Sequence, residues 1–233
     1  MVAALDLTGV DTVLLDAGGV LLLPDPEVLR KTLAPFGLSV TDEEARRGHY
    51  ECMAELDRIG CLDWPAVDRH LARILGVPDD RLDEVVEGIE ALYLSEPWVP
   101  VDGAAEALLR LQAVGFRLAV VSNAKGTIEA QLLDGRICSV QGGAVARVEV
   151  VIDSHVVGVE KPDPRIFQLA FDAIGAVPSS SLYIGDTVFF DVIGARAADI
   201  RPVHADPYAL CPGTADHPHV SSLGELARLL TGG

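Results

Sequence analysis

The sequence predicts an α/β protein in which helices cover a parallel sheet on both faces and a helical segment is inserted after the first strand. Two observations carry this prediction. Short, continuous apolar runs alternate with helical patterns, as in parallel sheets that are buried on both faces. The alternation is interrupted once, between residues 24 and 97, where helical signals occur without a convincing strand. The prediction therefore divides the chain into a core, residues 1–23 and 98–233, and an all-helical cap, residues 24–97.

The elements of the core follow from apolar runs that turn residues bound on each side. Such runs predict strands over residues 12–15, 118–121, 148–152, 182–184 and 202–204. Helical periodicity predicts helices over residues 104–114, 164–174 and 188–198. The stretch "HADPYALCPGTADHPH" is predicted to be a long loop before the last helix. Its histidines set no metal-ligand spacing, so no metal site is predicted from His204, His217 and His219.

The inserted segment contains four helical stretches, and we interpret their apolar stripes as packing core. Three of them begin with an N-cap residue. In two cases a proline follows the N-cap, and in one case a glutamate completes a capping box. These start signals, in order, are Asp25-Pro26, Thr41 with Glu44, and Asp63-Trp64-Pro65, and the fourth stripe runs from Leu82 to Leu92. Gly37 and Gly76 are predicted to end the first and third of these helices.

The composition excludes several classes of function. The chain has 233 residues and a formal net charge of −17, which disfavours nucleic acid as a partner. The sequence shows neither a basic leader nor a transmembrane-length apolar run, so a cytoplasmic protein without a membrane partner is predicted. The four cysteines are widely spaced and predict free thiols rather than disulfides or a zinc site: Cys52, Cys61, Cys138 and Cys211. The oligomeric state is left open, with a homodimer among the alternatives.

Polar side chains follow the predicted strands at the edge of the sheet where ligands of open parallel sheets bind. Asp16 comes directly after the first apolar run, in "VLLDAGGVL". Ser122 and Asn123 follow the second run and precede a predicted helix. A hydroxyl group and backbone N–H groups at the start of a helix suit an anion. These positions predict an anion-binding site beside the Asp16 carboxylate.

Two later segments add a positive charge and two more carboxylates. Lys161 stands just ahead of Pro162 and Pro164, which fix the backbone around it. Asp186 ends another strand, and Asp191 follows within about a turn and a half of helix. Carboxylates that gather near Asp16 require a cation, and oxygen ligands of this kind suit Mg²⁺.

In this order the residues resemble the four signature motifs of the haloacid dehalogenase-like superfamily. The residues within the motifs are similar as well: "VVSN", "GVEKPDPRIF" and "GD-x-x-x-x-D-V-x-G-A". The resemblance covers nearly the whole chain and is to the phosphatase-rich subfamily that carries a helical cap after the first strand. It implies a Rossmann-like α/β core, Mg²⁺ as cofactor and a small phosphorylated metabolite as substrate.

The resemblance also implies a role for each motif residue. Asp16 would be the nucleophile that forms an aspartyl-phosphate, with Ser122 and Lys161 as further catalytic residues. Substrate oxygens would be held by Ser122, Asn123 and Lys161. The Mg²⁺ ligands would be Asp16, the backbone carbonyl of Gly18, Asp186 and Asp191, the last directly or through water. Lys161 is further predicted to keep Asp16 ionised by lowering its pKa.

Gly18 departs from the family pattern, because phosphatases of this superfamily carry a second aspartate there as general acid and base. Three alternatives follow: hydrolysis of esters with good leaving groups, a substitute proton donor, or a homologue that binds phosphate with little or no turnover. Substitutes considered are His49, Tyr50, His70 and His155, and Lys31 as a cap lysine. A 2-haloacid dehalogenase is a further alternative, against which the metal-type "IGD" motif argues.

Overall fold

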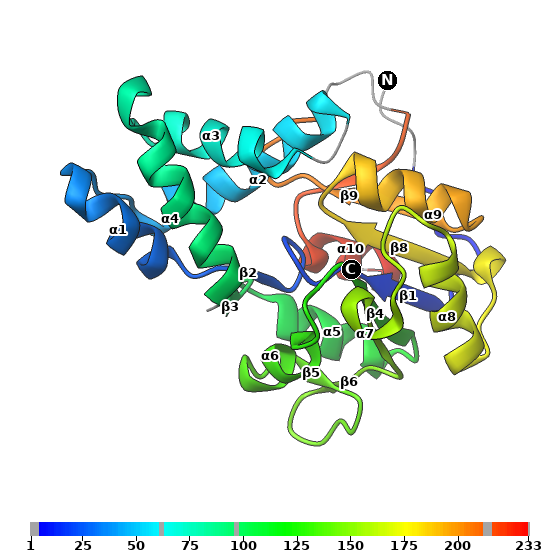
Figure 1. Cartoon of the computed structure of the whole chain (residues 1–233). Coiled ribbons are helices and arrows are strands. Elements are labelled where there is room, and N and C mark those ends of the chain that lie inside the picture. The colour runs from blue at the N-terminus through cyan, green and yellow to red at the C-terminus, as the bar shows by residue number, and fades with distance from the viewer. Residues whose placement is uncertain (1–4, 61–62, 96–97, 212–215, 233) are drawn as a thin grey trace. The chain divides into compact units, whose positions relative to one another are not determined.

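The computed structural model describes residues 5–60, 63–95, 98–211 and 216–232. The chain divides into two compact units, one formed by Met1–Leu22 with Pro100–Gly233 and the other by Leu23–Val99. Figure 1 shows both units, with elements labelled where there is room. Among the described helices, none combines the length and the apolar character that crossing a membrane requires.

The first unit is built on a six-stranded sheet with the strand order β10-β9-β8-β1-β4-β7. The neighbouring strands pair in parallel, which confirms the predicted fold class. The strands are β1 (Thr12–Leu15), β4 (Arg117–Ser122), β7 (Val151–Asp153), β8 (Ser181–Gly185), β9 (Arg201–Ala205) and β10 (His219–Val220). Because β8, β1 and β4 are adjacent and parallel, their carboxyl ends lie at one edge of the sheet.

Two details of this sheet differ from the sequence-based expectation. The predicted strand over residues 148–152 is β7, which begins only at Val151. The predicted loop after His204 contains β10, which pairs with β9 at the edge of the sheet. β10 is two residues long and therefore too short to show the alternation or the apolar run by which strands are recognised.

Helices cover the two faces of the sheet (Figure 1). On one face lie α8 (Arg165–Ile174) and α9 (Ile193–Ala197), which share a buried cluster with side chains of β1, β4 and β8. Within that cluster the rings of Phe167 and Tyr183 meet edge to face, with centroids 4.9 Å apart. On the other face lie α5 (Ala104–Ala113) and α10 (Leu223–Thr231), which pack against each other. The remaining elements are α6 (Ile128–Asp134), α7 (Ser154–Val157), the 3-10 turn η3 (Pro178–Ser180) and the paired short strands β5 (Cys138–Ser139) and β6 (Ala146–Arg147).

The predicted helix over residues 188–198 is two segments rather than one. A π-helical turn, η4 (Val188–Val192), precedes α9. Thr187 caps this turn, because its side chain accepts a hydrogen bond from the Phe190 N–H. π-helical turns are rare in proteins overall, but those that occur often lie at functional sites. This turn carries Asp191.

The second unit is helical. It contains α1 (Pro26–Leu33), η1 (Ala34–Phe36), α2 (Asp42–Ile59), α3 (Trp64–Ile74), η2 (Asp79–Arg81) and α4 (Leu82–Ser95), while β2 (Leu22–Pro24) pairs with β3 (Trp98–Pro100) where the chain enters and leaves it. The predicted helix starts are confirmed: the N-cap side chains of Asp25 and Asp63 accept hydrogen bonds from the first turn. Thr41 and Glu44 form a complete capping box.

Candidate active site

The structure places the motif residues at the carboxyl ends of adjacent strands. Asp16 directly follows β1, Ser122 is the last residue of β4, and Asp186 directly follows β8. In the sheet, Leu15 of β1 lies opposite Val120 of β4 and Ile184 of β8, so these chain ends are neighbours. All of the side chains named here are buried. The edge predicted to carry the site therefore does bring these residues together.

Three carboxylates form the centre of the site. Asp16, Asp186 and Asp191 each offer an oxygen atom, and these oxygens lie within 4.8 Å of one another. The ammonium of Lys161 lies 2.9 Å from Asp16 Oδ1 and 2.7 Å from Asp191 Oδ1. One buried ammonium faces three buried carboxylates, so the group carries an excess of negative charge when all are ionised. Such an oxygen donor set fits a hard divalent cation.

Asn123 holds the backbone that carries Lys161. The Lys161 N–H donates to Asn123 Oδ1 at 2.7 Å, and Asn123 Nδ2 donates to the Lys161 carbonyl at 3.1 Å. This pair of bonds ties the end of β4 to the segment before Pro162. The side chain of Asn123 is therefore a positioning group for Lys161, a role that the sequence analysis did not assign.

Both carboxylate oxygens of Asp191 already accept hydrogen bonds from the protein. Oδ1 accepts from Lys161, and Oδ2 accepts from the N–H and the hydroxyl of Thr187 at 2.9 and 2.7 Å. The Tyr183 hydroxyl lies 3.0 Å from Oδ1 and 2.8 Å from the Lys161 ammonium. Asp191 is thus locked in place, and this arrangement favours a role in orienting Lys161.

Sequence reasoning missed Tyr183 and Thr187. Tyr183 is buried in the middle of β8, where the apolar pattern predicts only core packing. Thr187 has the appearance of an ordinary helix cap, which it also is. A signal for Tyr183 did exist, because a fully buried tyrosine requires a hydrogen-bond partner for its hydroxyl.

The turn after Asp16 depends on Gly19. Its φ of +64° lies in the left-handed region, and an added Cβ would lie 2.0 Å from Asp186 Oδ2. Asp186 thus occupies the space that any side chain at position 19 needs. Gly18 lies half-buried between Asp16 and this turn.

Gly19→Ala is expected to remove the catalytic activity of this site and its affinity for a divalent cation, because the new methyl group displaces the Asp186 carboxylate. The matched control is Gly9→Ala, since Gly9 has a similar φ of +67° but no atom within 4 Å of its added Cβ. Gly9→Ala should cost about 1–2 kcal/mol of stability through backbone strain alone and leave activity intact. Equal activity of the two variants would contradict the proposed dependence on Asp186.

The charges of the site are strongly coupled. Burial raises the pKa of Asp16 to about 7. The carboxylates of Asp191 and Asp186 raise this pKa further, and the Lys161 ammonium lowers it without reversing the shift. Burial alone would lower the pKa of Lys161, but Asp16 and Asp191 outweigh it, so the pKa of Lys161 is raised. For Asp191 the burial effect is outweighed by Lys161 and Thr187, and its pKa is lowered.

Lys161 does lower the pKa of Asp16, as expected, but burial outweighs this effect, so Lys161 alone does not keep Asp16 ionised. Lys161 also pairs with Asp191, and the two acidic neighbours together with burial work against ionisation of Asp16. A second positive charge at the site would favour the ionised form of Asp16. A divalent cation among the three carboxylates has the right charge for this purpose.

Two other expectations about the site also change. The helix predicted after Asn123 is α6, which begins only at Ile128, and the N–H of Ala124 donates to the Ser154 hydroxyl. No helix start therefore lies directly behind Ser122 among the described residues. His155, a candidate proton donor, is exposed, and its backbone N–H donates a hydrogen bond to the side chain of the buried Asp153.

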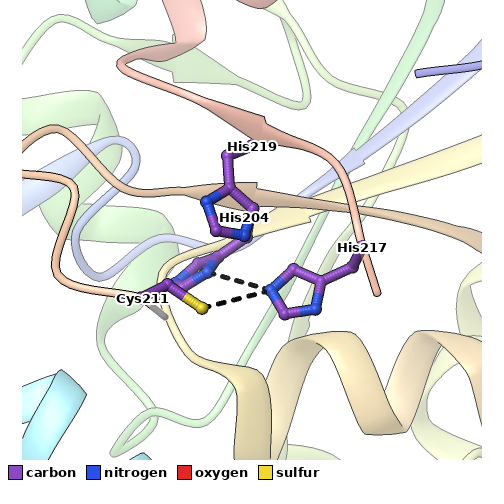
Figure 2. A group of neighbouring side chains, drawn as sticks. All are labelled: His204, Cys211, His217 and His219. Atoms are coloured by element: carbon purple, nitrogen blue, oxygen red, sulfur yellow. Dashed lines mark hydrogen bonds between the residues drawn. The ribbon is translucent and has the colours of Figure 1, made fainter. Parts of the chain in front are cut away.

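The three histidines from which no metal site was predicted lie close together in the structure. His204, His217 and His219 gather with Cys211 beside the end of β9 (Figure 2), and one ligand atom from each lies within 4.8 Å of the others. The pattern of spacing could not show this, because β9 and β10 bring the residues together across the sheet. Among the described residues no disulfide joins Cys52, Cys138 or Cys211, and Cys61 lies outside those residues.

Comparisons with known proteins agree with the fold and the motifs. A family model described as a haloacid dehalogenase-like hydrolase matches residues 10–199. Haloacid dehalogenase-like hydrolase domain-containing protein 3 of Homo sapiens is 33% identical over 175 residues, which is 72% of this chain and 65% of that protein. A phosphoserine phosphatase of Thermus thermophilus is 33% identical over 118 residues, 50% of this chain and 45% of that enzyme. The chain thus spans less than two thirds of the length of these relatives.

A solved structure extends the likeness of fold to nearly the whole chain. The HAD phosphatase of Thermococcus onnurineus has a TM-score of 0.56 at 21% identity, covering 95% of this chain and 98% of that one. The parallel sheet, the order of the motif residues at its edge and the match over residues 10–199 agree with one another. This chain belongs to the haloacid dehalogenase-like hydrolase family.

Proposed function

We propose that the chain is a Mg²⁺-dependent phosphatase that acts on a small phosphorylated metabolite through Asp16. The single observation that carries this proposal is the carboxylate of Asp16, which is held by Lys161 beside two further buried carboxylates. The family membership and the phosphatase among the relatives support the same reaction class. A cytoplasmic location and the absence of a nucleic-acid partner belong to this proposal.

Asp16 acts as the nucleophile. Its carboxylate attacks phosphorus, the bond between phosphorus and the ester oxygen breaks, and the phosphoryl group is transferred to Asp16. Water then attacks the phosphorus of this aspartyl-phosphate, releasing inorganic phosphate and restoring the carboxylate. The Ala17 N–H donates to Asp16 Oδ1 at 2.7 Å, which fixes the orientation of the carboxylate.

The transferring phosphoryl oxygens are held by donors at the same edge. Lys161 supplies a buried positive charge, and Ser122, at the end of β4, supplies a hydroxyl group. Phosphoryl transfer depends mainly on positioning and on charge neutralisation, which suits a rigid buried ammonium. The two hydrogen bonds between the Asn123 side chain and the Lys161 backbone, and the contact of Asp191 with the Lys161 ammonium, provide that rigidity.

Mg²⁺ would be held by Asp16, Asp186 and the Gly18 carbonyl, with Asp191 acting through water or through Lys161. When bound, Mg²⁺ supplies positive charge that neutralises the phosphoryl oxygens and favours the ionised state of Asp16. The helical unit Leu23–Val99 is proposed to act as a cap that selects the substrate.

Gly18 sets the expected substrate preference. No carboxylate at position 18 can protonate the leaving group, so esters with acidic leaving groups should react best. An acyl phosphate and an aryl phosphate should therefore be hydrolysed faster than an alkyl phosphate. The experiment is a screen of phosphorylated metabolites with and without Mg²⁺, scored by phosphate release. Saturable binding without turnover across the panel would favour the non-catalytic alternative instead.

Gly18→Asp is expected to raise turnover of alkyl phosphates by up to about 10²–10⁴-fold, the usual contribution of a general acid. Turnover of an acyl phosphate should change far less, since its leaving group needs little protonation. The ratio of the two rates is the measurement. If the ratio does not change, another residue already transfers the proton.

A further inference from the structure

The cluster of His204, Cys211, His217 and His219 lies in the first unit at the edge of the sheet and shares no residue with the group of three carboxylates. His204 of β9 and His219 of β10 are paired across the two strands. His217 Nε2 lies 3.3 Å from His204 Nδ1, and Cys211 Sγ lies 3.6 Å from His217 Nε2. Figure 2 shows the four side chains converging on one another. Ligand atoms at the corners of a tetrahedron around zinc are separated by about 3.3–3.8 Å.

Each histidine directs its other ring nitrogen at an oxygen atom. His204 Nε2 lies 3.1 Å from the Asp186 carbonyl, His217 Nδ1 lies 3.4 Å from Asp216 Oδ1, and His219 Nδ1 lies 3.4 Å from Asp206 Oδ2. Histidines that bind a metal commonly donate their second N–H to a carboxylate or a carbonyl in this way. The oxygens thereby select the tautomers whose bare nitrogens point into the cluster.

A count of protons shows that hydrogen bonds alone do not satisfy this cluster. The Asp186 carbonyl only accepts, so His204 carries its proton on Nε2 and its Nδ1 is a bare acceptor. His217 facing the Asp216 carboxylate carries its proton on Nδ1, which leaves Nε2 as an acceptor, with the Cys211 thiol 3.6 Å away as a weak donor. The 3.3 Å contact between these two nitrogens then joins two lone pairs. A cation between them removes the conflict.

His219 adds a third nitrogen in the same condition. Its Nε2 is buried and has no hydrogen-bond partner among the described residues. Leaving a buried polar atom unpaired destabilises the folded state, and a metal–nitrogen bond would offset this loss.

The loop that carries Cys211 is already shaped for ligation. The Asp206 carboxylate accepts hydrogen bonds from the Leu210 and Cys211 N–H groups at 2.8 and 3.1 Å. The same side chain is the one that faces His219 Nδ1, and it is 5% exposed. One buried aspartate thus orients both the cysteine backbone and a histidine ring.

We propose that His204, Cys211, His217 and His219 bind one Zn²⁺ ion in a closed, four-ligand structural site. Three imidazoles and a thiolate suit zinc and do not suit Mg²⁺ or Ca²⁺, which prefer oxygen ligands. Four protein ligands leave no open position for substrate or water, so the role is structural. The ion joins β9, β10 and the Cys211 loop, and through His204 it fixes the carbonyl of Asp186.

The test uses the full chain without a histidine tag, expressed in medium that contains zinc and purified in excess Mg²⁺. The Mg²⁺ occupies the carboxylate cluster, so that zinc held there is not counted. Elemental analysis should find about one zinc ion per chain, bound more tightly than about 10⁻⁷ M. A zinc-selective chelator should lower the melting temperature while Mg²⁺ remains present.

Cys211→Ser and His219→Ala should each weaken zinc binding by at least about 100-fold, since loss of a direct ligand exceeds the effect of losing its hydrogen-bond partner. The matched controls are Cys52→Ser and His155→Ala, which lie outside the cluster and should retain the zinc. Replacing zinc with Co²⁺ should produce a thiolate-to-cobalt absorption band that Cys211→Ser lacks.

Two results would overturn the proposal. One is wild-type protein that binds zinc no more tightly than about 10⁻⁵ M at neutral pH. The other is a Co²⁺ complex of the wild-type protein without a thiolate band, which decides the question even where a variant does not fold. Because the readouts are metal content and absorption, they are independent of phosphatase activity.

Discussion

Asp16→Asn is expected to abolish phosphatase activity, with a loss of at least about 10⁴-fold in kcat. The amide keeps the size of the side chain but is not a nucleophile at phosphorus. It also removes one of the three carboxylates that would hold the cation. The measurement is phosphate release from an acyl phosphate in saturating Mg²⁺, the substrate that needs the least help with its leaving group.

The folded state of this variant should be no less stable than that of the wild type. Burial raises the pKa of Asp16 to about 7, so ionisation of this group opposes folding between its unfolded pKa and neutral pH. A neutral amide removes that cost, while Lys161 keeps its ion pair with Asp191 at 2.7 Å. The melting temperature in metal-free buffer at neutral pH should therefore stay level or rise.

The control for this variant is Asp172→Asn, the same chemical change on the exposed face of α8. It should retain wild-type activity. Turnover of Asp16→Asn within about tenfold of the wild type would show that Asp16 is not the nucleophile. Inactivity accompanied by unfolding would instead mean that the site is needed for folding, and the melting curve separates the two results.

Lys161→Met is expected to destabilise the protein by about 3–5 kcal/mol at neutral pH, the usual result of removing one partner of a buried ion pair. The Lys161 side chain is 2% exposed, as is that of Asp191, so solvent does not screen the charge that remains. Activity should be lost as well, because the phosphoryl oxygens lose their buried cation. Urea unfolding with and without Mg²⁺ measures the first effect.

The loss of stability should depend on pH in a defined direction. In the wild type the pKa of Asp191 is lowered, with Lys161 and Thr187 outweighing its burial, so this group stabilises the fold above its unfolded pKa. Without Lys161 the pKa of Asp191 rises, and ionised Asp191 then opposes folding. The difference from wild type should therefore be largest near pH 7 and shrink as the pH falls toward 4.

Two further variants test the cause of this loss. Lys161→Met combined with Asp191→Asn removes the carboxylate left without its ammonium, and it should recover much of the stability. Lys31→Met is the control for the mutation itself, since Lys31 is 73% exposed in a surface pair with Glu27. It should change stability by less than about 0.5 kcal/mol. Equal destabilisation by Lys31→Met and Lys161→Met would contradict the buried charge pair.

Local patterns predicted much of the fold. The apolar runs identified β1, β4, β8 and β9 because a strand that is buried on both faces has a nearly continuous apolar sequence. The capping box of Thr41 and Glu44 was predictable because its hydrogen bonds join residues three positions apart. The two-residue strand β10 and the π-helical turn Val188–Val192 were not, since neither has a periodic signal of its own.

The sequence by itself determined which chemical groups this protein brings to its site: Asp16, Ser122 and Asp186 at the carboxyl ends of strands, and Lys161 from the segment before Pro162. Only the tertiary structure decided how they act on one another. Lys161 lies between Asp16 and Asp191, and burial with two acidic neighbours raises the pKa of Asp16 rather than lowering it. Strand pairing likewise brings His204 beside His219. The physical reason is that composition and periodicity are properties of neighbours along the chain, whereas charge coupling and ligation depend on register across strands.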